Sequence, residues 1–205
     1  TRKGGPCNFE TYTLTPHCNG THTECVGHIT KERVSILNSL KEEVMLSTLI
    51  TVSPERLKEN YTPPLNSKDL VITRRHLEEK IKSSSSNYLD ALIVRTLPNS
   101  IQKKERDYMQ NPSAFFTIEC MKYIVDLGVR HLLVDMPSVD RLFDDGLLTS
   151  HNIFWETKEK VLNSCAESKT ITEMIYVPDT IQDGGYLLNL QIAPFSTDAA
   201  PSRPI

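Results

Sequence analysis

The sequence has no excess of basic residues. Its 205 residues include 23 Lys and Arg against 26 Asp and Glu, which gives a formal net charge of −3. Nucleic acids and anionic membranes attract proteins with a clear basic excess, so neither is expected as a partner. The sequence also lacks an apolar run of the roughly 20 residues needed to span a bilayer. Its longest apolar stretches, at 44–52 and 131–134, are far shorter.

The cysteines offer no recognised disulfide or zinc pattern. There are five, an odd number, and none belongs to a C-x-x-C pair. They are Cys7, Cys18, Cys25, Cys120 and Cys165. A disulfide scaffold uses an even set and a zinc ribbon uses paired cysteines, so neither is expected. No signal peptide is recognisable at Thr1. Together these absences predict a reducing compartment and a cytoplasmic location.

A single domain covering residues 1–205 is expected from the composition. Hydrophobic residues make up 39% and charged residues 24% of a chain long enough to bury a sizeable core. Apolar runs predict strands at 44–52, 89–95, 132–135, 171–177 and 186–193. Helical spacing predicts helices at 73–82 and 113–128, with a polar helix within 157–167. The serine run at 83–86 is interpreted as a surface connection. This alternation predicts an α/β layered domain.

One short segment gathers groups that bind metals. Three of the six histidines lie in P-H-C-N-G-T-H-T-E-C-V-G-H at 16–28. There, Cys18, His22 and Glu24 offer a thiolate, an imidazole and a carboxylate, all of which zinc accepts. If residues 21–25 are extended, His22 and Glu24 project from one face, because side chains alternate along a strand. Gly20 would then allow a turn that brings Cys18 to the same point.

The alternative interpretation is that these histidines are partly solvated loop residues and that Cys18 and Cys25 are small apolar residues. The spacing C-x3-H-x-E is not one that general zinc rules single out. Spacing alone therefore leaves both interpretations open.

Several motifs resemble those of the metal-dependent cyclase family, which includes bacterial kynurenine formamidase and isatin hydrolase. G-T-H-T-E followed by His28 resembles the family signature H-x-G-T-H-x-D-x-P-x-H. D-M-P-S-V-D at 135–140 resembles its D-x-P-S-x-D turn, and P-S-R at 201–203 resembles its S-P-x-R tail. The resemblance covers nearly the whole chain in the right order. It implies mixed β-structure surrounded by helices, the swivelling β/β/α fold, and a leading segment missing before Thr1.

The resemblance also implies roles for particular residues. The family's ligand positions fall on Cys18, His22, Glu24, His151 and Glu173. The family's general acid or base falls on His28. His17, adjacent to Cys18, is the alternative first ligand if the backbone is displaced by one residue.

Two ligand positions differ from the family pattern. Cys18 replaces a histidine and favours a softer ion, zinc rather than manganese. Glu24 replaces an aspartate, and its extra methylene favours a single ion over a bridged pair. One zinc ion is therefore expected, with manganese or a second ion as alternatives.

The expected activity is metal-dependent hydrolysis of the C–N bond of a small amide or lactam, such as an arylformamide. The alternatives are a catalytically inactive metal- or ligand-binding protein and a metal-dependent cyclase or lyase. The family also implies a small-molecule substrate and a homodimer or larger homo-oligomer.

Other residues have plainer interpretations. Asp135 and Asp140 flank a Pro-Ser turn and are expected to tie it down through backbone amides. For Phe154 and Trp155, a place in a pocket lining and a place in the core are equally expected. His131 is isolated and is interpreted as structural or solvated.

Overall fold

The computed structural model describes residues 4–57, 60–83 and 88–205. Its strands are β1 (His22–Cys25), β2 (Val44–Val52), β3 (Val71–Ile72), β4 (Ala91–Thr96), β5 (Phe115–Phe116), β6 (His131–Val134), β7 (Thr170–Glu173), β8 (Gly184–Ile192) and β9 (Ala199–Pro204). Its α-helices are α1 (Pro16–Asn19), α2 (Ile36–Ser39), α3 (Arg74–Ser83), α4 (Ile118–Asp126) and α5 (Thr149–Phe154). Three 3₁₀ segments are η1 (Val26–His28), η2 (Ile101–Glu105) and η3 (Ser164–Ala166).

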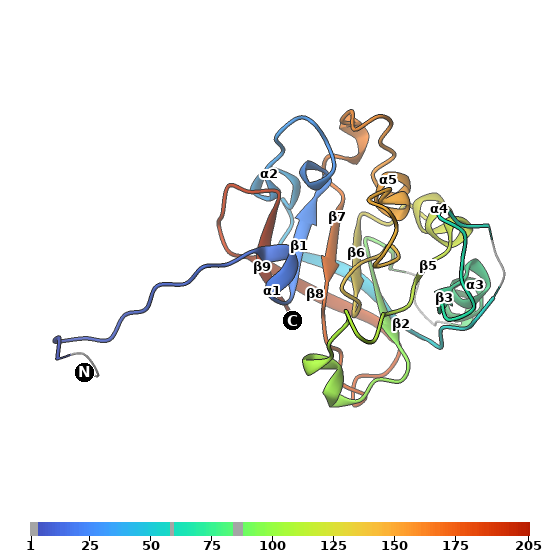
Figure 1. Ribbon diagram of the computed structural model, residues 1–205, viewed down its shortest axis with the longest axis horizontal. Helices are drawn as coiled ribbons and strands as arrows, with labels where there is room; N and C mark the ends of the chain where they lie inside the picture. Colours follow the sequence, from blue (N-terminus) through green and yellow to red (C-terminus); the bar gives the residue numbers. More distant parts are fainter. Residues whose placement is uncertain (1–3, 58–59, 84–87) are drawn as a thin grey trace.

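The strands form a closed mixed barrel in the order β1-β7-β6-β4-β2-β8-β9 (Figure 1). β2, β4, β6 and β7 run parallel, as expected for strands joined by helical crossovers. β1 and β8 run antiparallel to their neighbours. The last strand, β9, pairs with both β1 and β8 and so closes the barrel. This architecture confirms the expected mixed α/β domain.

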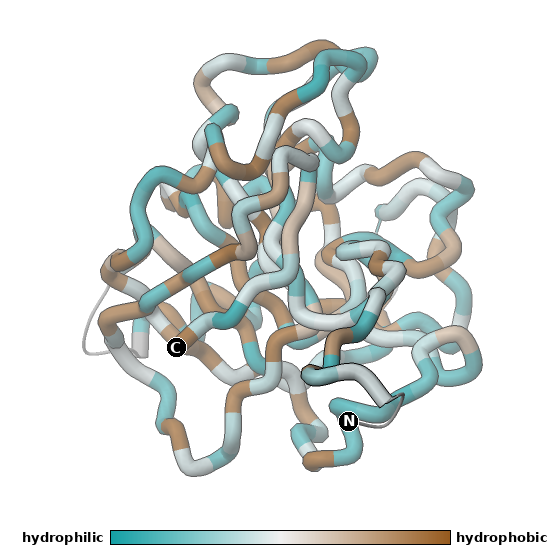
Figure 2. The backbone as a smooth tube through the Cα atoms, turned by 90° about the vertical axis from the view of Figure 1, so that its left-hand side faces the viewer, coloured by the Kyte–Doolittle hydropathy of each residue, from teal (hydrophilic) through white to brown (hydrophobic). Residues whose placement is uncertain are grey.

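Two apolar cores lie on opposite faces of the barrel strands. Along β4, Leu92 and Val94 belong to the larger core, which includes residues of α3 and α4. Ala91 and Ile93, which alternate with them, belong to the smaller core with residues of β2 and β8. Figure 2 shows how hydrophobic and hydrophilic residues are distributed along the backbone. Side chains on both faces of a parallel strand are buried when helices cover the sheet.

Helices α3, α4 and α5 cover one side of the barrel (Figure 1). The backbone N–H of His76 donates to Oγ1 of Thr73 just before α3, and that of Cys120 donates to Oγ1 of Thr117 at the start of α4. These threonines therefore cap the two helices. None of the helices in the described part of the chain is long and apolar enough to cross a membrane.

Most predicted elements are present with small changes in their ends. The strand predicted at 44–52 is β2, and the helix predicted from Thr73 is α3. The helix predicted from 113 begins only at Ile118, because Phe115 and Phe116 pair with β3 as the short strand β5. Residues 84–86 of the predicted serine connection lie outside the described residues.

The polar helix predicted within 157–167 is wrong. Lys158 and Val161 form an isolated β-bridge, and only Ser164–Ala166 make a 3₁₀ turn. Glu159 and Lys160 have positive φ angles of 52° and 62°. A right-handed helix excludes such angles. The chain turns tightly at these two residues instead of continuing as a helix.

His131 is a completely buried histidine at the start of β6, away from the predicted metal segment. Its Nδ1 lies 2.8 Å from Oγ1 of Thr170, and its Nε2 has no hydrogen-bond partner among the described residues. Burial lowers the pKa of His131 to about 4. An unfolded histidine binds a proton near pH 6.5, so between about pH 6.5 and 4 the unfolded state binds the proton and the folded state does not. The folded state therefore loses stability as the pH falls through this window.

Replacing His131 with Asn should remove this loss. We expect the wild-type free energy of unfolding to fall by ~3 kcal/mol more than that of His131→Asn between pH 7 and pH 4. Urea denaturation at several pH values measures the difference. The control is Thr170→Val, which removes the hydrogen bond but leaves the buried imidazole and should keep the wild-type pH dependence. Identical pH profiles for wild type and His131→Asn would contradict the prediction.

Candidate metal centre

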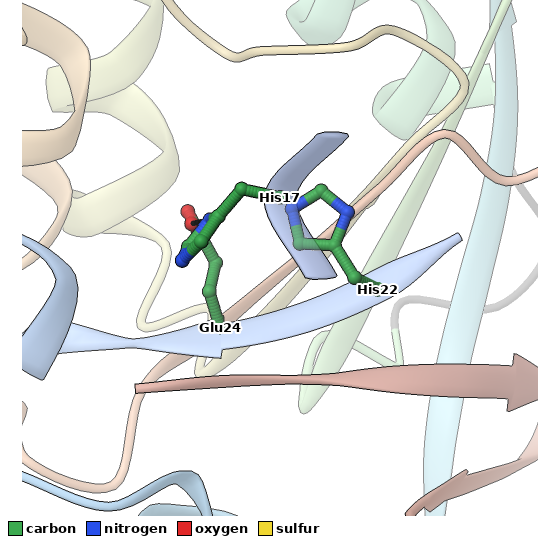
Figure 3. A group of neighbouring side chains, drawn as sticks. All are labelled: His17, His22 and Glu24. Atoms are coloured by element: carbon green, nitrogen blue, oxygen red, sulfur yellow. Dashed lines mark ion pairs between the residues drawn. The ribbon is translucent and has the colours of Figure 1, made fainter. Parts of the chain in front are cut away.

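The pairing of β1 with β7 sets the first part of the centre. His22 lies directly opposite Glu173 in the antiparallel register, and its Nε2 is 3.5 Å from Oε2 of Glu173. His22 and Glu24 project from the same face of β1, as the alternation of a strand requires (Figure 3). All three side chains are buried. The predicted extension of 21–25 is therefore correct, and it places two donors side by side.

His17 reaches this point from helix α1, immediately before β1 (Figure 3). Its Nδ1 lies 3.0 Å from Oε2 of Glu24. Its Nε2 lies 2.9 Å from Oδ2 of Asp198, in the loop before β9. One imidazole is thus held between a buried carboxylate and a more exposed one.

The structure brings His17, and not Cys18, to the other donors. Cys18 is exposed, and it belongs to none of the groups of close metal-ligating atoms found among the described residues. The reason is that Pro16–Asn19 form a short helix rather than an extended segment. Successive side chains on a helix point in different directions, so turning His17 inward turns Cys18 outward. The expectation that favoured Cys18 over His17 needs this correction.

His151 comes from α5, on the far side of Glu24. Its Nε2 lies 3.0 Å from Oε1 of Glu24 and 3.8 Å from Oε1 of Glu173. Its Nδ1 lies 2.6 Å from Oδ2 of Asp140. Asp140 also accepts hydrogen bonds from the backbone N–H groups of Ser150 at 2.6 Å and of His151 at 3.2 Å. It therefore fixes both the start of α5 and the orientation of the imidazole, rather than its own turn as the sequence predicts.

His28 lies at the rim of the group, at the end of η1. Its ring stacks on that of His17, with centroids 4.1 Å apart and planes at 27°. Its Nε2 is 4.0 Å from Oε2 of Glu24, and its Nδ1 is 3.5 Å from Oδ2 of Asp198. Unlike His22 and His151, its side chain is 28% exposed. This histidine is accessible to a molecule that reaches the centre.

A close backbone approach holds η1 in place. A Cβ atom on Gly27 would lie 2.3 Å from the carbonyl oxygen of Val34. Only glycine permits this contact, so the position of His28 depends on its neighbour as well as on its own contacts.

The electrostatics of the group follow from burial and from mixed charges. Burial alone would raise the pKa of Glu24, but His151, His17 and His28 hold it well below its usual range. Burial alone would lower the pKa of His17, but Glu24 and Asp198 raise it to about 9. Burial and the charge of Glu24 raise the pKa of Glu173. Protons on His17 and His151 therefore balance the charge of the buried carboxylates.

The donors fit a divalent metal ion. The atoms of His17, His22 and Glu24 lie within 4.8 Å of one another, as do those of Glu24, His28 and His151. Nε2 of His22 and Oε2 of Glu24 are buried without hydrogen-bond partners among the described residues, although Nδ1 of His17 is near that oxygen. Buried polar atoms without partners are uncommon and indicate a missing ligand. Imidazoles and carboxylates suit zinc and related ions.

Asp140 and Asp198, whose carboxylates orient His151 and His17, were not identified in these roles from the sequence. Asp198 follows Phe195-Ser196-Thr197 in a loop, with no local motif. It reaches His17 because Glu24 pairs with the next residue, Ala199, between β1 and β9.

Phe154 and Trp155 are fully buried, and the ring centre of Trp155 lies 5.5 Å from that of His151. They therefore belong to the core that supports this histidine.

Asp135 has different partners from those of Asp140. Its Oδ2 accepts a hydrogen bond from the backbone N–H of Thr96 at the end of β4, and it pairs with Lys103 at 2.8 Å. The expected tie to a backbone amide is present, but the amide belongs to a neighbouring strand.

Comparison with known proteins agrees with this architecture. The curated kynurenine formamidase of Bacillus cytotoxicus is 25% identical over 204 residues, covering 99% of this chain and 81% of that protein. Isatin hydrolase A from Labrenzia aggregata superposes with a TM-score of 0.67 at 12% identity, covering 100% of this chain and 78% of the other. A structure described as a potential metal-dependent hydrolase with cyclase activity gives a TM-score of 0.64 at 16% identity, covering 94% and 79%. At these identities the solved structures show a shared fold.

The family assignment comes from the sequence model. The model of the Cyclase family, described as "Putative cyclase", matches residues 4–141, which is more than half of the chain and includes His17, His22, Glu24 and His28. This chain therefore belongs to the Cyclase family.

Proposed function

We propose that this protein is a zinc-dependent hydrolase that cleaves the C–N bond of a small aryl amide, such as an arylformamide or a lactam. The observation that carries the proposal is the convergence of imidazoles on the two buried carboxylates of Glu24 and Glu173. The names of its relatives, kynurenine formamidase and isatin hydrolase, supply the reaction class.

Glu24 lies at the centre of the proposed ligand set. Its Oε2 faces His17, with His22 beside that imidazole, whereas its Oε1 faces His151. Glu173 lies near both His22 and His151. These side chains would hold one ion, or two. When bound, zinc lowers the pKa of a water ligand and polarises a carbonyl group.

His28 is the proposed general acid and base. Burial lowers the pKa of His28, so its imidazole is neutral near pH 7 and can accept a proton. The nearby carboxylate of Asp198 favours a proton on Nδ1, which leaves Nε2 directed at the buried donors. His28 would accept a proton as water adds to the carbonyl carbon and donate it to the leaving nitrogen.

Hydrolysis should require both a metal and His28. We expect zinc-loaded wild type to release formate and aniline from formanilide, and chelation to abolish this turnover until zinc is restored. His28→Ala should lower kcat by about 10²- to 10⁴-fold, because a positioned acid–base group contributes about that much. Its zinc content, measured by atomic absorption, should match wild type. Turnover by metal-stripped protein would refute the proposed hydrolase.

Metal binding should distinguish His17 from Cys18. We expect Glu24→Gln to abolish high-affinity zinc binding and His17→Ala to weaken it strongly, because each removes a donor from the buried set. Cys18→Ser, one residue from His17 but on the exposed side of α1, is the matched control and should bind zinc like wild type. Isothermal titration calorimetry gives both affinity and stoichiometry. A loss of affinity in Cys18→Ser alone would reverse the assignment.

Asp198→Asn should weaken zinc binding, because it removes the carboxylate that holds His17. Asp198 holds Nε2 of His17, and such a carboxylate partner typically contributes about 10- to 100-fold in metal affinity. The control is Asp183→Asn, whose carboxylate contacts Thr51 and Arg95 rather than a site histidine. The affinities are measured by competition with a chromophoric chelator. An unchanged affinity in Asp198→Asn would mean that His17 needs no such support.

A further inference from the structure

The carboxylate of Asp140 makes hydrogen bonds through both of its oxygens. Oδ2 accepts from the backbone N–H of His151 at 3.2 Å and lies 2.6 Å from Nδ1 of the same residue. Oδ1 accepts from the backbone N–H of Ser150 at 2.6 Å and from the hydroxyl of Tyr61 at 2.9 Å. One oxygen therefore holds the imidazole of His151, and the other is held by Tyr61 and by the start of α5.

The turn that carries Asp140 supports two of the proposed metal ligands. The backbone N–H of Val139 donates to Oε1 of Glu173 at 3.0 Å, and the next residue, Asp140, holds His151. The carbonyl oxygen of Val139 accepts from the backbone N–H of Phe116 at 3.2 Å, which ties the turn to β5. A displacement of this turn would therefore disturb Glu173 and His151 together.

Tyr61 reaches Asp140 from the segment before β3. It is buried, and its ring centre lies 5.0 Å from that of Phe115. Val71 joins the two rings in a small apolar cluster. Burial and the charge of Asp140 raise the pKa of Tyr61 well above its usual value. The hydroxyl therefore keeps its proton at neutral pH and acts as the donor to the carboxylate.

A second hydrogen bond joins the same two parts of the chain. The hydroxyl of Thr149, the first residue of α5, donates to the carbonyl oxygen of Thr62 at 3.3 Å. Thr62 directly follows Tyr61 in the sequence. This second bond fastens the two segments without involving the carboxylate of Asp140. It therefore provides a way to separate fastening of the segments from support of the carboxylate.

We propose that Tyr61 is a positioning residue of the metal centre, which acts through Asp140 to hold the imidazole of His151 in place as a metal ligand. A carboxylate that accepts a hydrogen bond from a ligating histidine fixes the orientation of the ring, and its own hydrogen bonds fix the carboxylate. Loss of the Tyr61 hydroxyl would leave Oδ1 of Asp140 to the N–H of Ser150, so the carboxylate could turn. The role toward a metal rests on the proposed function, whereas the orientation of His151 does not.

Zinc affinity tests this role without catalysis. We expect Tyr61→Phe to weaken zinc binding about tenfold, as is typical when a group that supports a metal ligand is lost. This change removes the hydroxyl and keeps the ring that packs on Phe115. Thr149→Val is the matched control and should bind zinc like wild type. An unchanged affinity in Tyr61→Phe, or an equal loss in Thr149→Val, would overturn the proposal.

A double-mutant cycle shows whether Tyr61 acts through Asp140. Asp140→Asn alone should weaken zinc binding by about 10- to 100-fold, because it removes the carboxylate partner of His151. Adding Tyr61→Phe to Asp140→Asn should then change the affinity little, since two groups that act in series are not additive. Fully additive losses would show that Tyr61 does not act through Asp140.

The orientation of His151 can also be followed without zinc. In metal-free protein containing isotope-labelled histidine, we expect an NMR signal from the Nδ1 proton of His151, identified by its loss in His151→Gln. This signal should shift in Tyr61→Phe and keep its wild-type position in Thr149→Val. If it shifts as expected but wild type binds no zinc, the proposed metal centre fails and the positioning role stands. If zinc binds to both proteins equally and the signal does not move, the positioning role fails and the metal centre stands.

Discussion

A buried carboxylate is the constraint from which the rest of the centre follows. Glu24 is fully buried, and an isolated charge in such a place is too costly to keep. The protein surrounds it with the imidazoles of His17, His28 and His151. Protons on His17 and His151 supply the opposing charge, and a bound cation would replace them. The buried carboxylate of Glu24 therefore makes the centre selective for positive charge.

Barrel closure brings these side chains together from distant parts of the chain. β1 lies between β7 and β9, so its neighbours contribute Glu173 on one side and the loop of Asp198 on the other. The outer carboxylates then fix the imidazoles. Asp140 holds His151 from α5, and Asp198 holds His17. Orientation is thus supplied by the fold as a whole, which is how rigid sites reach a defined geometry.

Local pattern explains how much of the site was predictable. His22 and Glu24 share a face because they are two apart in a strand, a rule that needs no tertiary information. The choice between His17 and Cys18 depended on whether four residues form a helical turn, and that depends on packing. Asp198 had no local signal at all, because only the β1–β9 register brings it near. The fold was predicted well where strands are apolar, as in β2, and failed at 157–167, where a polar segment adopts tight turns with positive φ.

The donors are divided between the two ends of the polypeptide. His17, His22 and Glu24 lie near the beginning, whereas Glu173 and Asp198 lie near the end, and β9 completes the barrel last. A ribosome therefore releases the early donors long before it has made the groups that enclose them. The nascent chain lacks the complete set of donors until β7 and β9 have been made, so the proposed metal can meet the whole set only after these strands have paired with β1.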